Sequence, residues 1–180
     1  VTAAFDRLVA RIPHASWFAA LGEALQPAEQ AELASYIRGL GLLACATAAV
    51  ADWREAGRVA SDPAWDRGWW DAEERLRAEL MARADAAHGA RIVMDRLSTV
   101  AQAAHDATIG PAAMAAARLG IADQALVRAA AGAATQSCYQ SGLALLAGAS
   151  DPSHPFHAKL RLFLGGRWPL GILRGSAYMF

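Results

Sequence analysis

The sequence predicts an all-α fold, a bundle of about seven to eight helices that ends in a short β-hairpin. Alanine supplies 46 of the 180 residues, and valine, isoleucine and threonine are few, which favours closely packed helices over a sheet. Apolar residues recur at helical spacing until about residue 150, after which the chain becomes aromatic and rich in glycine. We therefore expect a single domain over 1–180, with 167–180 as a hairpin appendage.

The first half of the chain divides into helices at prolines. Apolar residues at i, i+3, i+4 and i+7 predict a helix over 5–12, which Pro13 ends, and a short helix follows over 15–25. A longer helix is predicted over 27–58, bent at its glycines, and Asp62 before a proline begins another over 63–89.

The second half follows the same rules. A helix is predicted over 91–107, and Gly110–Pro111 separates it from a short helix over 111–119. Asp123 caps a long alanine-rich helix that reaches residue 149, and a last helix spans 155–164.

The closing residues predict two short strands. Apolar residues alternate from Trp168 to Ile172, and Arg174–Gly175 offers a two-residue turn into a strand over 176–180. Two strands alone are marginal in water, so this hairpin must cover the helices or meet another chain.

Composition argues against several classes of protein. The 17 basic and 17 acidic residues balance and form no basic stripe, which disfavours a nucleic-acid partner. The two long uncharged runs are too short or too polar to predict a membrane span. Cys45 and Cys138 lie far apart in apolar helical sequence, which favours free thiols in a reducing, cytoplasmic compartment, and no signal peptide is recognised.

Two polar groups are weighed as chemical sites. His154 and His157, with Asp151 nearby, could contribute to a metal site, but their number favours ordinary helix-end histidines, so no metal or cofactor is expected. Cys138 lies in the polar stretch "TQSCYQS" with no histidine near in sequence. We interpret these small residues as positions of close helix packing.

Four of the six tryptophans fall within 53–70, interleaved with charged residues. Neighbouring helical residues point about 100° apart, so one of Trp69 and Trp70 is expected at a rim. Core packing is the favoured interpretation, and an interface is the alternative because Trp and Arg are enriched in interface hot spots. The candidate binding residues are Trp65, Arg67, Trp69, Trp70, Arg167, Trp168, Tyr178 and Phe180.

The absence of a catalytic motif favours a non-catalytic interaction protein, such as an adaptor or a neutralising, immunity-type partner of another protein. A homo-oligomer belongs to the same hypothesis. The alternative is an enzyme or a small-molecule binding protein with a pocket between helices, made polar by Cys138, His105 or the His154/His157 pair. A concave pocket with convergent polar groups would favour the alternative, and a flat exposed aromatic patch would favour the interaction protein.

Overall fold

A computed structural model describes residues 2–121 and 123–180 and is mainly helical, as predicted. The described helices are α1 (Thr2–Arg11), the 3₁₀ turn η1 (Ile12–His14), α2 (Pro27–Gly39), α3 (Trp53–Ser61), α4 (Arg67–His88), α5 (Ala90–Arg118), α6 (Gln124–Leu146) and α7 (Pro155–Leu164). Asp52, Asp66 and Asp123 cap α3, α4 and α6 by accepting hydrogen bonds from first-turn backbone N–H groups.

A small mixed sheet completes the fold. The predicted hairpin is confirmed as β2 (Pro169–Leu173) and β3 (Ser176–Met179), antiparallel and joined at Arg174–Gly175. A third strand, β1 (Ala46–Ala49), pairs in parallel with β3, so that the hairpin's second strand is central in the order β1-β3-β2.

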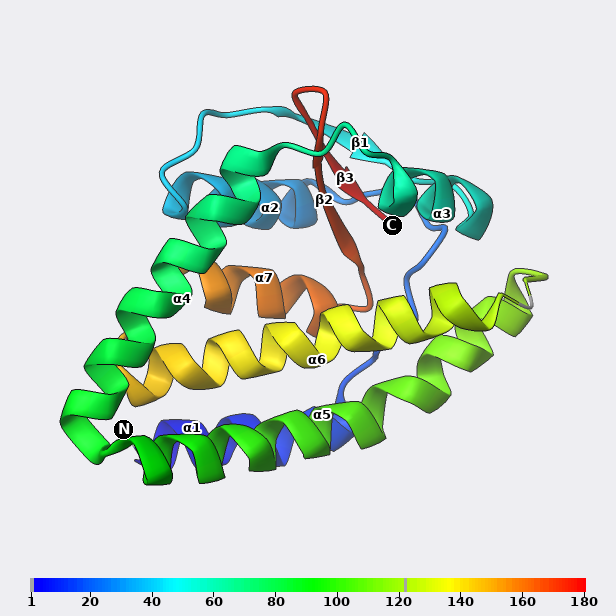
Figure 1. Ribbon diagram of the computed structural model, residues 1–180. Helices are drawn as coiled ribbons and strands as arrows, with labels where there is room; N and C mark the ends of the chain where they lie inside the picture. The colour runs from blue at the N-terminus through cyan, green and yellow to red at the C-terminus, as the bar shows by residue number, and fades with distance from the viewer. Residues whose placement is uncertain (1, 122) are drawn as a thin grey trace.

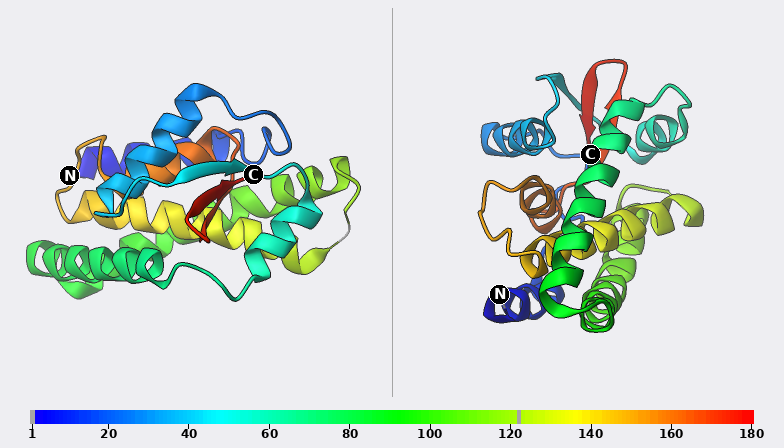
Figure 2. Two further views of the ribbon diagram at one scale, coloured as in Figure 1. Left: turned by 90° about the horizontal axis from the view of Figure 1, so that it is seen from above. Right: turned by 60° about the vertical axis from the view of Figure 1, so that its left-hand side comes forward.

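The elements stack in layers around α6 and α7 (Figure 1). α5 packs along α6, α1 contacts α6 on the same side, and α2 packs along α7 on the other side. The sheet lies beside α2 and α3, while α4 crosses from the sheet end of the molecule to the start of α5 (Figures 1 and 2). α6 and α7 therefore form the centre against which the other layers are placed.

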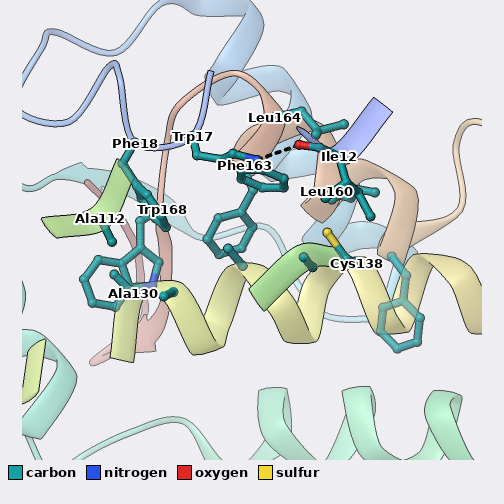
Figure 3. Close-up of a cluster of buried hydrophobic side chains, with 14 of the residues drawn as sticks. Ile12, Trp17, Phe18, Ala112, Ala130, Cys138, Leu160, Phe163, Leu164 and Trp168 are labelled. Carbon is teal, nitrogen blue, oxygen red and sulfur yellow. Dashed lines mark hydrogen bonds between the residues drawn. The ribbon is translucent and has the colours of Figure 1, made fainter. Parts of the chain in front are cut away.

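The core joins the hairpin to the helices. Trp53 of α3 lies with its ring 5.9 Å from that of Trp168 and 5.4 Å from that of Phe180, and all three side chains are buried. Figure 3 shows Leu160 and Leu164 of α7 beside Ile12, and Cys138 of α6 directed into the same apolar cluster.

Several predicted element boundaries are wrong. The helix predicted over 27–58 ends at Gly39, because the chain turns there and enters β1 before α3 begins. The segment 15–25 forms turns instead of a helix, and α4 begins at Arg67 instead of 63. The break predicted at Gly110–Pro111 does not occur: Pro111 lies inside α5, which changes direction along its length (Figure 1).

Candidate functional site

The residues predicted to form a binding surface lie mostly inside the protein. Of the eight, Trp69, Arg167, Trp168 and Phe180 are buried, Trp65 and Tyr178 are half-buried, and Arg67 and Trp70 are exposed. Trp70 keeps 47% of its surface exposed beside buried Trp69, which confirms that one of this adjacent pair lies at a rim. The eight residues do not form one continuous exposed patch.

Arg167 instead organises the segment that precedes α2. Its guanidinium donates hydrogen bonds to the carbonyl oxygens of Ala20 at 2.6 Å, Glu23 at 2.8 Å and Ala24 at 2.8 Å. Its Nε also lies 2.8 Å from the Glu29 carboxylate. A buried guanidinium is stable only when its charge and its N–H groups are paired. These hydrogen bonds hold residues 20–24, which form no helix, in place before α2.

A second buried polar cluster joins four helices. Lys159 of α7 donates from Nζ to Glu73 Oε1 of α4 at 2.6 Å, and Tyr36 of α2 donates to the same oxygen at 2.6 Å. Gln140 of α6 completes the cluster by accepting from Lys159 at 3.3 Å. Trp69 donates from Nε1 to the Tyr36 hydroxyl at 2.6 Å. We call these five residues the buried network.

The buried network has a structural character. Burial, together with the charge and hydrogen bond of Glu73, raises the pKa of Tyr36 well above its usual value. The phenol therefore stays protonated and acts as a donor. None of the five residues lines a described surface hollow, so we assign the network to fixing α2, α4, α6 and α7 relative to one another.

A groove of about 590 Å³ opens between α1, α6 and α7. It is lined by Ala4, Arg7, Leu8, Ala10, Arg11, Ser141, His157, Leu160, Arg161 and Leu164. Leu160 and Leu164 belong to the apolar cluster of Figure 3, so the groove has an apolar floor that is continuous with the core. A further hollow of about 410 Å³ shares Ala4 and Arg7 with the groove and extends it toward the end of α6.

A serine and a histidine from different helices meet in this groove. Ser141 Oγ of α6 lies 2.7 Å from His157 Nδ1 of α7, and His157 Nε2 lies 2.8 Å from the backbone oxygen of Ala149. A carbonyl oxygen can only accept, so Nε2 carries the proton in this bond. In the neutral imidazole Nδ1 is then the acceptor, and the Ser141 hydroxyl donates to it.

The surroundings keep His157 neutral. Burial lowers the pKa of His157, the charge of Arg161 lowers it further, and the hydrogen bond to Ala149 and the charge of Asp151 oppose the change. Neighbouring His154 has its pKa lowered to about 4 by burial and by the charges of His157 and Arg83. At neutral pH the groove therefore presents an imidazole that can accept a proton.

Three arginines line the groove, and two of them, Arg7 and Arg11, supply its unpaired positive charge. Arg161 is held by Glu32 on one side and donates to the Pro152 carbonyl at 2.7 Å. Arg7 and Arg11 are exposed on α1, and within the described part of the chain neither has an ion-pair or hydrogen-bond partner. No acidic residue is among the described residues that line the groove. Arg7 and Arg11 therefore give it an excess of positive charge.

Other candidate groups do not come together. Across residues 2–121 and 123–180 no three His, Cys, Asp or Glu side chains are placed to hold a metal ion, so His154, His157 and Asp151 do not form the considered site. Burial raises the pKa of Cys138 to about 12, which leaves this thiol unreactive. In the same described residues no helix is long and apolar enough to cross a membrane.

The pairing of Ser141 with His157 was not predicted from the sequence. They lie sixteen positions apart on two consecutive helices, so no spacing motif connects them, and the small residues of the stretch that contains Ser141 were interpreted as positions of close packing. Arg7 and Arg11 were missed because a lone arginine on an amphipathic helix carries no signal. The special position of Lys159 could have been suspected from the sequence, because it is the only lysine in a chain with 16 arginines.

Comparison with protein families, curated proteins and solved structures finds no match to this chain. The chain is a mainly helical protein with a three-stranded mixed sheet and a cationic groove that contains a Ser–His pair.

Proposed function

We propose that the protein binds a small anionic molecule in the groove between α1, α6 and α7. The observation that carries this proposal is the lining: the unpaired guanidinium groups of Arg7 and Arg11, no carboxylate among the described lining residues, and an apolar floor around one hollow. A volume of about 590 Å³ lies within the usual range for small-molecule sites. The convergence of polar groups in a concave pocket favours a ligand-binding protein over an interaction protein.

The charge pattern specifies the ligand further. Arg7 and Arg11 lie one helical turn apart on α1, so both guanidinium groups can reach one carboxylate or phosphate. Leu8, Leu160 and Leu164 offer apolar surface next to this charge. The groove thus suits a carboxylate that carries a short apolar chain.

The experiment is calorimetric titration with octanoate as the probe and octanol as its uncharged counterpart. We expect octanoate to bind more tightly than octanol, and the double variant Arg7→Gln/Arg11→Gln to weaken octanoate binding about tenfold, because each charge-assisted hydrogen bond contributes about 1.5–3 kcal/mol before screening by water. The matched control is Arg91→Gln/Arg128→Gln, which removes two exposed charges outside the groove. Equal binding of octanoate and octanol, or equal loss in both double variants, would contradict the proposal.

A protein partner or a second copy of the chain is a second proposal, supported by one observation. Trp70 exposes 47% of its surface on α4, and exposed Arg67 lies three residues earlier on the same helix face. In this proposal the protein acts as an adaptor or a neutralising partner in a reducing, cytoplasmic compartment, where Cys45 and Cys138 stay free.

The test combines sedimentation with affinity capture by the wild-type protein, by Trp70→Ala and by Met114→Ala, the last an exposed apolar residue on α5. A complex of defined stoichiometry that Trp70→Ala abolishes and Met114→Ala preserves supports the second proposal. Monomeric behaviour together with no Trp70-dependent complex counts against it.

A further inference from the structure

We infer that Ser141 is a nucleophile and His157 its general base, and that the groove accepts a carboxylic ester which carries a second, anionic group. The recognition of that second group rests on the proposed function, because Arg7 and Arg11 would bind it. The nucleophile and its base rest on a separate observation, the Ser141–His157 geometry.

The geometry contains the parts that activation of a serine requires. A nucleophilic serine needs an adjacent base within hydrogen-bond distance, and the base needs a third group that fixes its tautomer and orientation. The Oγ–Nδ1 distance is 2.7 Å, and the Ala149 carbonyl holds the opposite nitrogen at 2.8 Å. The carbonyl takes the orienting position that a carboxylate occupies in other serine nucleophile sites.

The hydroxyl of Ser141 is not used by its own helix. Serines inside helices commonly donate to the carbonyl oxygen four residues earlier, which removes them from chemistry. In the described part of the chain the only hydrogen-bond partner of Ser141 Oγ is His157. Ser141 has 2% of its surface exposed and belongs to the groove wall, so the groove is the route by which a substrate reaches it.

The reaction balances with the groups present and one water molecule. Ser141 Oγ forms a bond to the ester carbonyl carbon while its proton moves to His157 Nδ1. The carbon–oxygen bond to the alcohol then breaks, and the alcohol leaves with that proton. Water, deprotonated by His157, attacks the acyl group on Ser141, and the carboxylic acid departs as Ser141 regains its proton.

The experiment uses a fluorophosphonate probe and two chromogenic esters of equal length, the mono-p-nitrophenyl ester of suberic acid and p-nitrophenyl octanoate. We expect the probe to modify Ser141, as located by peptide mass spectrometry, and this modification to be absent in Ser141→Ala. His157→Gln keeps a donor for the Ala149 carbonyl but removes the base. We expect it to fold and to lower the rate of ester hydrolysis about 100-fold or more.

Several results separate this inference from the proposed function. Labelling of Ser141 that matches the labelling of exposed Ser98, or hydrolysis that is unchanged in Ser141→Ala, would overturn the nucleophile, even where octanoate binds. Specific labelling with no preference for the suberate ester would support the nucleophile and contradict the anionic ligand. The rate should rise with pH to a plateau whose midpoint lies below 6.5, since burial lowers the pKa of His157.

Discussion

Lys159, the only lysine in the chain, forms a buried ion pair with Glu73, its Nζ 2.6 Å from Oε1. The ammonium also lies 5.6 Å from the centre of the Tyr36 ring and 5.9 Å from that of Trp69. Both charged groups are buried away from water, so the attraction between them must offset the free-energy cost of their desolvation. This pair connects α7 to α4 across the centre of the protein.

Breaking this pair on one side should be strongly destabilising. Lys159→Met leaves the Glu73 carboxylate buried without its cation, and we expect a loss of about 3–5 kcal/mol in the free energy of unfolding, measured by urea denaturation. The double variant Glu73→Gln/Lys159→Met removes both charges and keeps an acceptor for Tyr36, so it should be more stable than Lys159→Met.

The exposed pair between Arg77 and Glu74 provides the control. Its atoms are also 2.6 Å apart, but both side chains are about one-third exposed. Arg77→Gln should therefore cost about 1 kcal/mol or less. If Lys159→Met costs no more than Arg77→Gln, the buried pair does not have the role assigned to it.

Stability should fall in mild acid because of His154. Burial lowers its pKa from 6.5 to about 4, so the unfolded chain binds more protons than the folded one in this range. The contribution of His154 is complete above pH 6.5 and is lost as the pH falls toward 4. His154 Nδ1 accepts from the Phe156 N–H at the start of α7, so His154→Asn keeps this cap and removes the titration.

We expect His154→Asn to unfold with a shallower dependence on pH between about 4 and 6.5 than the wild type, measured by thermal melts across this range. His157 contributes in the same direction and remains in the variant, so some dependence should persist. His105→Asn, at an exposed position of α5, is the control and should melt like the wild type. An unchanged slope in His154→Asn would exclude His154 as its source.

Two glycines should respond in opposite ways to alanine. Gly171 of β2 has φ +131°, and a Cβ there would lie 2.7 Å from Cζ3 of the Trp69 ring. Gly171→Ala must therefore both strain the backbone and displace a buried indole, and we expect a loss of about 2–4 kcal/mol. Gly132 of α6 is exposed, has helical geometry and has no other part of the protein within 4 Å of a Cβ placed there, so Gly132→Ala should gain about 0.5–1 kcal/mol. Denaturant unfolding of both variants tests the difference in sign.

The hairpin was predictable and β1 was not, for one physical reason. The hairpin carries its own signals, alternating apolar residues and a Gly turn. The β1 sequence Ala46–Ala49 has little strand propensity and pairs only because β3 presents a free edge. Pro111 shows the same limit, because the packing of α5 along α6 overrides a local helix breaker.

The candidate site was less predictable than the fold. Helix boundaries follow from neighbours in sequence, whereas Ser141, His157 and Arg7 meet only through the packing of α1, α6 and α7. The tryptophans show the reverse case. They form a conspicuous cluster in the sequence, but Trp53, Trp69 and Trp168 are buried and do not form the candidate site. Aromatic clusters in sequence thus indicated the core, and the polar groove was assembled from residues without a local pattern.

Removal of the hairpin should prevent the chain from folding. β3 is the central strand, and Trp168 and Phe180 exchange backbone hydrogen bonds of 2.7 and 3.0 Å while both rings pack on Trp53. A chain that ends at residue 166 would leave Trp53 and β1 uncovered, so we expect no cooperative unfolding transition by circular dichroism. The milder Phe180→Ala should fold and lose about 3–5 kcal/mol, whereas Tyr178→Ala, half-buried on the same strand, should lose less. A cooperative transition in the truncated chain would instead make the hairpin an appendage that is free to meet another molecule.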